Sequence, residues 1–169
     1  MTLLKVNAIP ALLERLGITV PTPHRRDDAT VWDLELDGER RRGLRLSLIH
    51  DARPGGVLVV WAHLAPPLGD GLRKAYRRLL EWNDKYLFAK FGIAEDGRPV
   101  LSIELRAEQA SEGDLVEALA RAVLIADRLL DETAAWIWIG GRIPADDGSP
   151  RRNAPLLRAA PDLADRLEG

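Results

Sequence analysis

The side chains of this 169-residue chain that could do chemistry are few and scattered. Cysteine is absent, which excludes disulfides, thiolate metal ligands and a cysteine nucleophile. The three histidines, His24, His50 and His63, lie far apart and lack the spacing of a metal-binding pair. No serine stands in a nucleophile-elbow pattern, and no glycine-rich stretch ends in the Gly-Lys-Ser/Thr of a phosphate loop. We therefore expect no catalytic residues, no bound metal and no cofactor, and we expect that the chain is not an enzyme.

Two groups of polar residues still carry a functional alternative. His50 and Asp51 at a predicted strand end could form an acid–base couple, although a turn histidine beside a turn aspartate is the commoner arrangement. Asp33, Glu35 and Asp37 alternate along one predicted strand and could bind a cation, although a solvent-facing acidic strand face is the commoner explanation. The simpler interpretation is favoured for both groups.

The most unusual segment is AAWIWIGG at residues 134–141, which holds two tryptophans and no charge. It is too short to cross a bilayer, which needs about 20 apolar residues. It must therefore pack against the chain itself, for example under the C-terminal leucines 156, 157 and 163, or against a partner. Because aromatic residues favour interface cores, the candidate protein interface consists of Trp136, Ile137, Trp138, Ile139 and Leu124. Whether residues 136–139 form helix or strand stays open.

Composition limits the class of protein. Hydrophobic residues make up 46% of the chain and charged residues 30%, which is typical of a globular domain. The net charge of −2 gives no reason to expect a nucleic-acid partner. The N-terminus lacks the basic leader and apolar core of a signal peptide, and no segment is long enough to span a membrane. We expect a cytoplasmic protein.

Hydrophobic periodicity predicts the element order α-β-β-β-α-β-β-α. This order predicts an α+β fold with a five-stranded antiparallel sheet and helices packed on it. Residues 18–29 are expected to form an extended connector. The predicted helices are 8–16, 72–83 and 112–131, and the predicted strands lie within 31–38, 43–50, 57–64, 87–94 and 100–106.

Apolar spacing also predicts which residues are buried. In the second helix the buried side is expected to consist of Leu72, Ala75, Tyr76, Leu79, Leu80 and Trp82. Trp32, Trp61 and Trp82 lie inside predicted elements and are expected in the core. The helix at 112–131 carries two adjoining apolar stripes, more than one sheet face usually hides, which favours a homodimer.

Residues 79–132 resemble the YbjN family, which is grouped with the type III secretion chaperone-like (Tir chaperone-like) proteins. The resemblance rests on the helix ending at Asn83, the strand 87–94, the turn Glu95-Asp96-Gly97, its paired strand and the helix that carries Ala126-Asp127. Asn83 is expected to cap its helix, and Asp127 to hydrogen-bond a neighbouring backbone.

The resemblance implies a dimeric α+β domain that binds proteins or peptides without catalysis. We therefore expect a YbjN-like domain at residues 1–141 followed by a Pro/Arg/Asp-rich C-terminal extension at 142–169. The expected function is that of a chaperone-like or regulatory adaptor, with a second copy of itself and a protein or peptide client as partners. The alternative function is a small-molecule or stress-signalling sensor on the same fold.

Overall fold

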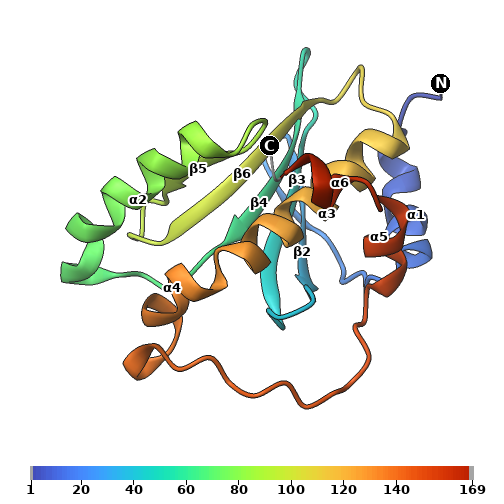
Figure 1. Ribbon diagram of the computed structural model, residues 1–169. Helices are drawn as coiled ribbons and strands as arrows, with labels where there is room; N and C mark the ends of the chain where they lie inside the picture. Colours follow the sequence, from blue (N-terminus) through green and yellow to red (C-terminus); the bar gives the residue numbers. More distant parts are fainter. Residues whose placement is uncertain (1, 168–169) are drawn as a thin grey trace.

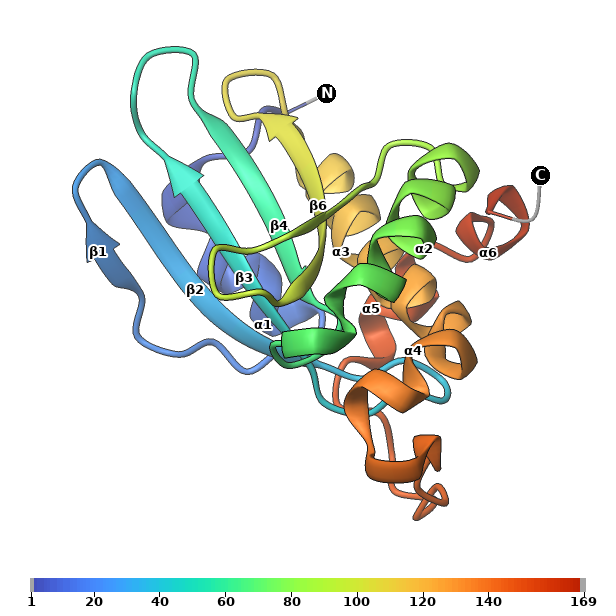
Figure 2. The ribbon, with the colours of Figure 1, turned by 90° about the vertical axis from the view of Figure 1, so that its left-hand side faces the viewer.

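A six-stranded antiparallel sheet organises the chain, and helices pack mainly on one of its faces (Figures 1 and 2). The computed structural model describes residues 2–167, apart from the side chain of Leu72. The sheet order is β1-β2-β3-β4-β6-β5. Its strands are β1 (His24–Arg26), β2 (Ala29–Leu36), β3 (Leu44–Asp51), β4 (Val57–His63), β5 (Lys90–Ile93) and β6 (Pro99–Arg106). The predicted α+β class is confirmed.

The sequence missed strand β1, so the sheet has six strands rather than five. All three residues of β1 are exposed, so they show no apolar alternation. The strand pairs with β2 across a tight turn in which Asp27 adopts a positive φ of 52°. Asparagine and aspartate tolerate this conformation better than most residues, which explains how the short hairpin forms without glycine.

Alternation of the strand residues creates the core. Trp32, Leu34 and Leu36 of β2 point to the same face as the leucines of β3 at 44, 46 and 48, and all six are at most 3% exposed. Helices α1 (Ile9–Arg15) and α3 (Glu112–Arg128) cover this face (Figure 2). Ser111 begins α3 with a capping box in which its side chain and that of Asp114 bind each other's backbone N–H.

The opposite face of strands β1 to β4 has no helix over it in residues 2–167 (Figure 2). We call it the open sheet face. β4 lies in the middle of the sheet, but its residues Val57, Val59 and Trp61 on this face are only partly buried. The expectation that Trp61 is a core residue is therefore wrong, because an apolar central strand does not guarantee cover on both sides.

Helix α2 (Leu72–Lys85) packs at the other edge of the sheet, against β5 and helix α4 (Leu130–Ile137). The ring of Trp82 lies 5.5 Å from that of Phe91 and 5.6 Å from that of Trp136. The expectation that Asn83 caps its helix is wrong, because the helix continues to Lys85. The side-chain amide of Asn83 instead donates to the carbonyl of Phe91 at 3.0 Å and accepts from the same residue's N–H at 2.7 Å. It therefore fixes α2 to strand β5.

Helix α2 also corrects the prediction of its buried side. Ala75, Leu79 and Trp82 are buried, as expected, but Tyr76 is 48% exposed and Leu80 is 70% exposed. The apolar arc of this helix is thus wider than the surface that the rest of the protein covers.

The C-terminal segment packs on helix α3. Its helices α5 (Ala154–Ala159) and α6 (Leu163–Arg166) both contact α3, and Leu156 and Leu163 have no exposed surface. The second apolar stripe of α3, which favoured a homodimer in the sequence, is therefore covered within the chain. Three single turns of 3₁₀ helix, Val6–Ala8, Gly69–Gly71 and Ile139–Gly141, complete the described elements.

We predict that replacing Leu156 with alanine lowers the free energy of unfolding by about 3 kcal/mol, because it leaves a cavity between α5 and α3. Urea denaturation followed by circular dichroism measures the change. Arg158→Ala, at an exposed position of the same helix, is the control and should change it by less than about 0.5 kcal/mol. Equal effects of the two substitutions would show that α5 is not part of the core.

Candidate functional site

The strip that the sequence singled out lies at the end of helix α4. The helix ends at Ile137, Trp138 is extended, and a 3₁₀ turn at Ile139–Gly141 follows. The open choice between helix and strand is thus resolved as helix and then turn. Trp136 and Trp138 are half-buried, whereas Ile139 is fully exposed. Leu124 lies in the preceding helix α3, where it is half-buried against the core.

The C-terminal leucines do not provide the cover that one interpretation of the strip required. Their helices α5 and α6 pack on α3 rather than on α4 and the strip (Figure 1). Trp136 packs instead on Trp82 of α2. The role of the strip and Leu124 as a protein interface stays a prediction.

The polar candidates are separated in space. His50 and Asp51 are adjacent in β3 and so point to opposite faces, and the Asp51 carboxylate is bound by Arg53. Asp33 and Glu35 lie exposed on the open sheet face, but Asp37 follows the strand end and is 2% exposed. The interpretation of Asp37 as part of a solvated acidic face is therefore wrong.

Asp37 begins the loop 37–43, which joins β2 to β3 and is fixed at both sides by side chains distant in sequence. The Asp37 carboxylate accepts hydrogen bonds from the N–H of Gly43 at 3.0 Å and from Nε of Arg152 at 3.1 Å. Burial alone would raise the pKa of Asp37, but these bonds outweigh it and lower the pKa to about 2. Asn153 adds two bonds to the Asp37 backbone, at 2.6 and 2.9 Å.

Asp127 of α3 holds the middle of the same loop. One of its carboxylate oxygens accepts the backbone N–H groups of Arg40 at 2.8 Å and Arg41 at 2.6 Å. The prediction that Asp127 hydrogen-bonds a neighbouring backbone is confirmed. Gly38 must lack a side chain here, because a Cβ would lie 2.5 Å from the Asp127 carboxylate. The loop therefore has a defined path that carries Arg41 inward.

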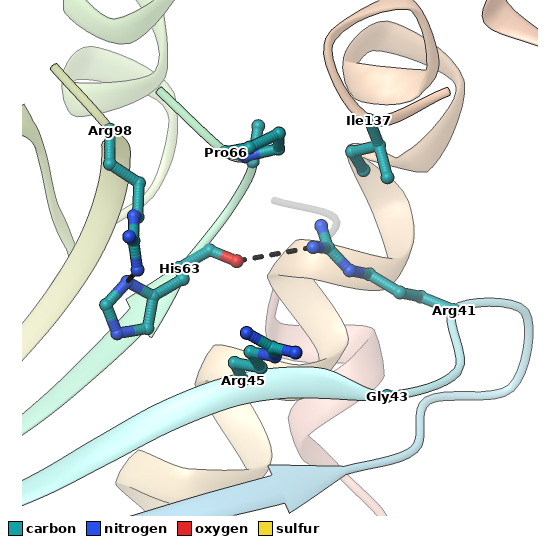
Figure 3. Close-up of a pocket in the computed structure, with 8 residues that line it drawn as sticks. Arg41, Gly43, Arg45, His63, Pro66, Arg98 and Ile137 are labelled. Carbon is teal, nitrogen blue, oxygen red and sulfur yellow. Dashed lines mark hydrogen bonds between the residues drawn. The ribbon is translucent and has the colours of Figure 1, made fainter. Parts of the chain in front are cut away.

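Loop 37–43 forms one wall of a basic pocket where β3 begins and β4 ends (Figure 3). The pocket has a volume of about 250 Å³. An adjoining hollow of about 440 Å³ extends onto the open sheet face beside Asp33 and Glu35 and shares Arg45, His63 and Arg98 with the pocket. The basic pocket is lined by Arg41, Gly43, Arg45, His63, Ala65, Pro66, Arg98 and Ile137.

Arg41 is the least usual residue of the basic pocket. Arg41 is only 8% exposed, yet no carboxylate binds its guanidinium. Nη2 donates to the carbonyl of His63 at 3.3 Å, as Figure 3 shows, while Nη1 is buried without a hydrogen-bond partner. Burial lowers the pKa of Arg41 to about 10, against a smaller opposing effect of Asp127. Arg41 therefore remains a cation at neutral pH.

His63 and Arg98 form the opposite wall. Nη1 of Arg98 lies 3.0 Å from Nδ1 of His63, and burial followed by the charge of Arg98 lowers the pKa of His63. His63 is then neutral at pH 7, and if Nδ1 accepts from Arg98, its proton lies on Nε2, where it can donate. Arg98 also pairs with Asp96 at 3.0 Å, but its Nε is buried without a partner.

No pattern in the sequence indicates the basic pocket. Arg41 lies in a short basic run that reads as a solvated turn, and Arg45 and Arg98 stand singly among polar residues. The pocket exists because β3, β4 and β6 are neighbours in the sheet and because their ends meet loop 37–43. Ile137 is the one member of the predicted interface that lines it.

Within residues 2–167, no group of three or more histidine, aspartate or glutamate side chains could hold a metal ion. None of the helices in this range is long and apolar enough to cross a membrane.

We predict that Trp136→Ala lowers the free energy of unfolding by about 2 kcal/mol, because Trp136 packs against Trp82 across α2 and α4. Thermal or urea denaturation measures this change in the free energy of unfolding. Ile139→Ala, in the same strip but fully exposed, should leave stability unchanged. A larger loss of stability in Ile139→Ala than in Trp136→Ala would mean that the strip packs on the protein through Ile139.

We predict that Asp37→Asn costs about 2 kcal/mol of stability at pH 7. Because the pKa of Asp37 is about 2 in the folded protein and 3.8 ordinarily, its contribution is complete above about pH 4 and is lost as the pH falls toward 2. The difference between the urea-unfolding curves of the two proteins should therefore shrink over this range. Asp131→Asn, at an exposed ion pair with Arg40 of the same loop, is the control and should have a much smaller effect. A constant difference from pH 7 to 2 would contradict the prediction.

Comparison with known proteins extends the resemblance beyond the central segment. A model of the YbjN family, described as "Putative bacterial sensory transduction regulator", matches residues 5–135. A search of curated proteins gave no match. The matched region begins before α1 and ends within α4, so it includes the whole sheet and the ends of β3, β4 and β6 that line the basic pocket. Because the match spans well over half of the sequence, this chain belongs to the YbjN family.

Proposed function

We propose that this protein is a non-catalytic, protein-binding regulatory domain of the cytoplasm that acts as a homodimer. The observation that carries the proposal is the exposed apolar surface of helix α2. The family description, a regulator of sensory transduction, supports a binding rather than a metabolic role.

The α2 patch consists of Tyr76, Leu80, Leu87 and Phe88, which are 48%, 70%, 69% and 79% exposed. Tyr76 and Leu80 lie one turn apart on the outer side of α2, and Leu87 and Phe88 follow directly after the helix. Phe88 keeps a positive φ of 60°, which a bulky residue rarely adopts, with the guanidinium of Arg121 5.5 Å from its ring centre. Large apolar side chains exposed along one helix and directly after it are a candidate contact site.

The charges of α2 support a second copy of the chain as the occupant. The first half of the helix is basic, and the second half contains the acidic residues. Leu80 lies near the middle. Two α2 helices packed antiparallel about a twofold axis would bring Leu80 against Leu80 and place each basic half beside the partner's acidic half. The charged residues are Arg73, Lys74, Arg77 and Arg78, then Glu81, Asp84 and Lys85.

The non-catalytic part of the proposal rests on the chemistry of the basic pocket. Arginine remains protonated and is a poor general base, and His63, the residue that titrates nearest to neutral pH, already contacts Arg98 through one ring nitrogen. The residues that line the pocket include no serine, threonine or lysine that could act as a nucleophile. This set of side chains favours binding over bond cleavage.

The proposal predicts that Leu80→Ser disrupts the homodimer. Size-exclusion chromatography with light scattering at micromolar concentration should give about twice the chain mass of 18.7 kDa for the natural protein and the monomer mass for the variant. The dissociation constant should rise at least about tenfold, which corresponds to the loss of about 1.4 kcal/mol. Because Leu80 is exposed, the stability of the protomer should change by less than about 0.5 kcal/mol.

Ile139→Ser is the matched control, since it changes an exposed apolar residue of the other candidate surface, the strip. If Ile139→Ser produces monomers and Leu80→Ser does not, the dimer forms through the strip and the assignment to α2 is wrong. A natural protein that is monomeric at high concentration would refute the homodimer itself.

A further inference from the structure

We propose that the basic pocket is a binding site for the phosphate group of a small anionic molecule. Arg41, Arg45, His63 and Arg98 would hold the phosphate, and the apolar residues Pro66 and Ile137 would contact the rest of the ligand. This site is separate from the α2 patch, so the inference does not depend on the proposed homodimer.

The first argument is the buried guanidinium of Arg41. Removing a cation from water is costly unless hydrogen bonds and an opposite charge compensate for it. Arg41 receives only a carbonyl at Nη2, and Nη1 remains without a partner in a residue 8% exposed. The protein nevertheless fixes its backbone through Asp127 at 2.6 Å. A group with two or more acceptor oxygens in the pocket would supply the missing partner.

The second argument is the convergence of donors from four segments. Figure 3 shows Arg41 from loop 37–43, Arg45 from β3 and the His63–Arg98 pair around one space. The side chain of Arg45 makes no hydrogen bond or ion pair with the described residues, and Nε of Arg98 has no partner. Guanidinium groups bind phosphate oxygens in pairs, so three of them around one space fit a tetrahedral anion.

The third argument is the balance of charge. The acids near the pocket do not pair with Arg41 or Arg45: Asp96 pairs with Arg98, Glu35 pairs with Arg152 at 2.8 Å, and Asp33 accepts from Ser47 at 2.7 Å and lies 3.4 Å from His24. One carboxylate oxygen of Asp127 accepts hydrogen bonds from two backbone N–H groups of loop 37–43. Arg41 and Arg45 therefore keep a positive charge that no carboxylate of the described chain pairs with directly. That uncompensated charge selects an anion.

The shape of the site suits a small organic phosphate better than a polymer. The pocket of about 250 Å³ and the adjoining hollow of about 440 Å³ meet at Arg45, His63 and Arg98. A phosphate at this junction would leave the rest of the molecule beside Pro66 and Ile137 or along the open sheet face. Sites of this size are typical of small-molecule ligands.

Isothermal titration calorimetry of the full chain with pyrophosphate and with inorganic phosphate tests the proposal, with sodium chloride at matched ionic strength as the reference. We expect saturable binding of one pyrophosphate per chain and a rise in melting temperature above that in sodium chloride. Arg45→Gln should weaken the binding at least tenfold while the protein stays folded, because Arg45 is exposed and has no partner in the described chain.

Arg106→Gln is the matched control, since Arg106 also lies exposed on the open face but pairs with Val57 at the far end of β4 from His63. It should bind pyrophosphate like the natural protein. Arg41→Met is a second test and should abolish binding without lowering the melting temperature in sodium chloride. Absence of saturable binding at millimolar pyrophosphate, or an equal loss in Arg106→Gln and Arg45→Gln, would overturn the proposal. Arg45→Gln should lose pyrophosphate binding and still form the dimer, because the basic pocket and the α2 patch are separate surfaces.

Discussion

The carboxylate of Asp37 is almost completely removed from water, and two segments distant in sequence, the loop 37–43 and residues 152–153, meet around it. A buried carboxylate destabilises a fold unless it is paired and fully hydrogen-bonded. Here Gly43 closes the loop 37–43 from one side, and Arg152 supplies its backbone N–H and its guanidinium from the other. Asn153, which has no exposed surface, forms hydrogen bonds with the backbone N–H and carbonyl of Asp37 at the same point. The loop and the C-terminal segment therefore hold each other through the bonds of Arg152 and Asn153 to Asp37.

That constraint determines where Arg41 lies. A five-residue stretch between Asp37 and Gly43 would otherwise be a mobile hairpin loop, but it is held at its ends by Arg152 and in its middle by Asp127. Holding the loop in this way directs Arg41 into the protein, where its charge is poorly compensated. Residues that satisfy a function instead of stability often break the rule that buried charges are paired. The stabilising contacts of Asp37 and the unfavourable burial of Arg41 are parts of one local structure.

The sequence predicted the elements that bury one clear face and missed those that do not. Strands β2, β3 and β6 alternate, and so they were found within a few residues of their observed bounds. Residues 24–26 have no apolar side chain, so hydrophobic periodicity could not predict β1. Tyr76 and Leu80 continue the apolar spacing of α2, but spacing alone does not reveal whether a partner surface exists. The basic pocket could not be predicted at all, because it joins residues 41, 63 and 98 through the order of the strands.

The part of the chain outside the family match shapes the site as much as the part inside it. The match ends at residue 135, yet Ile137 lines the basic pocket and Arg152 and Asn153 fix the loop that carries Arg41. A YbjN domain without these residues would keep the sheet and the strand ends, with Arg45, His63 and Arg98 in place. It would lose the apolar wall at Ile137 and the restraint on loop 37–43 from the C-terminal side. The residues beyond the family match therefore do more than cover α3: Ile137 adds an apolar side to the basic pocket, and Arg152 and Asn153 restrain the loop that carries the buried Arg41.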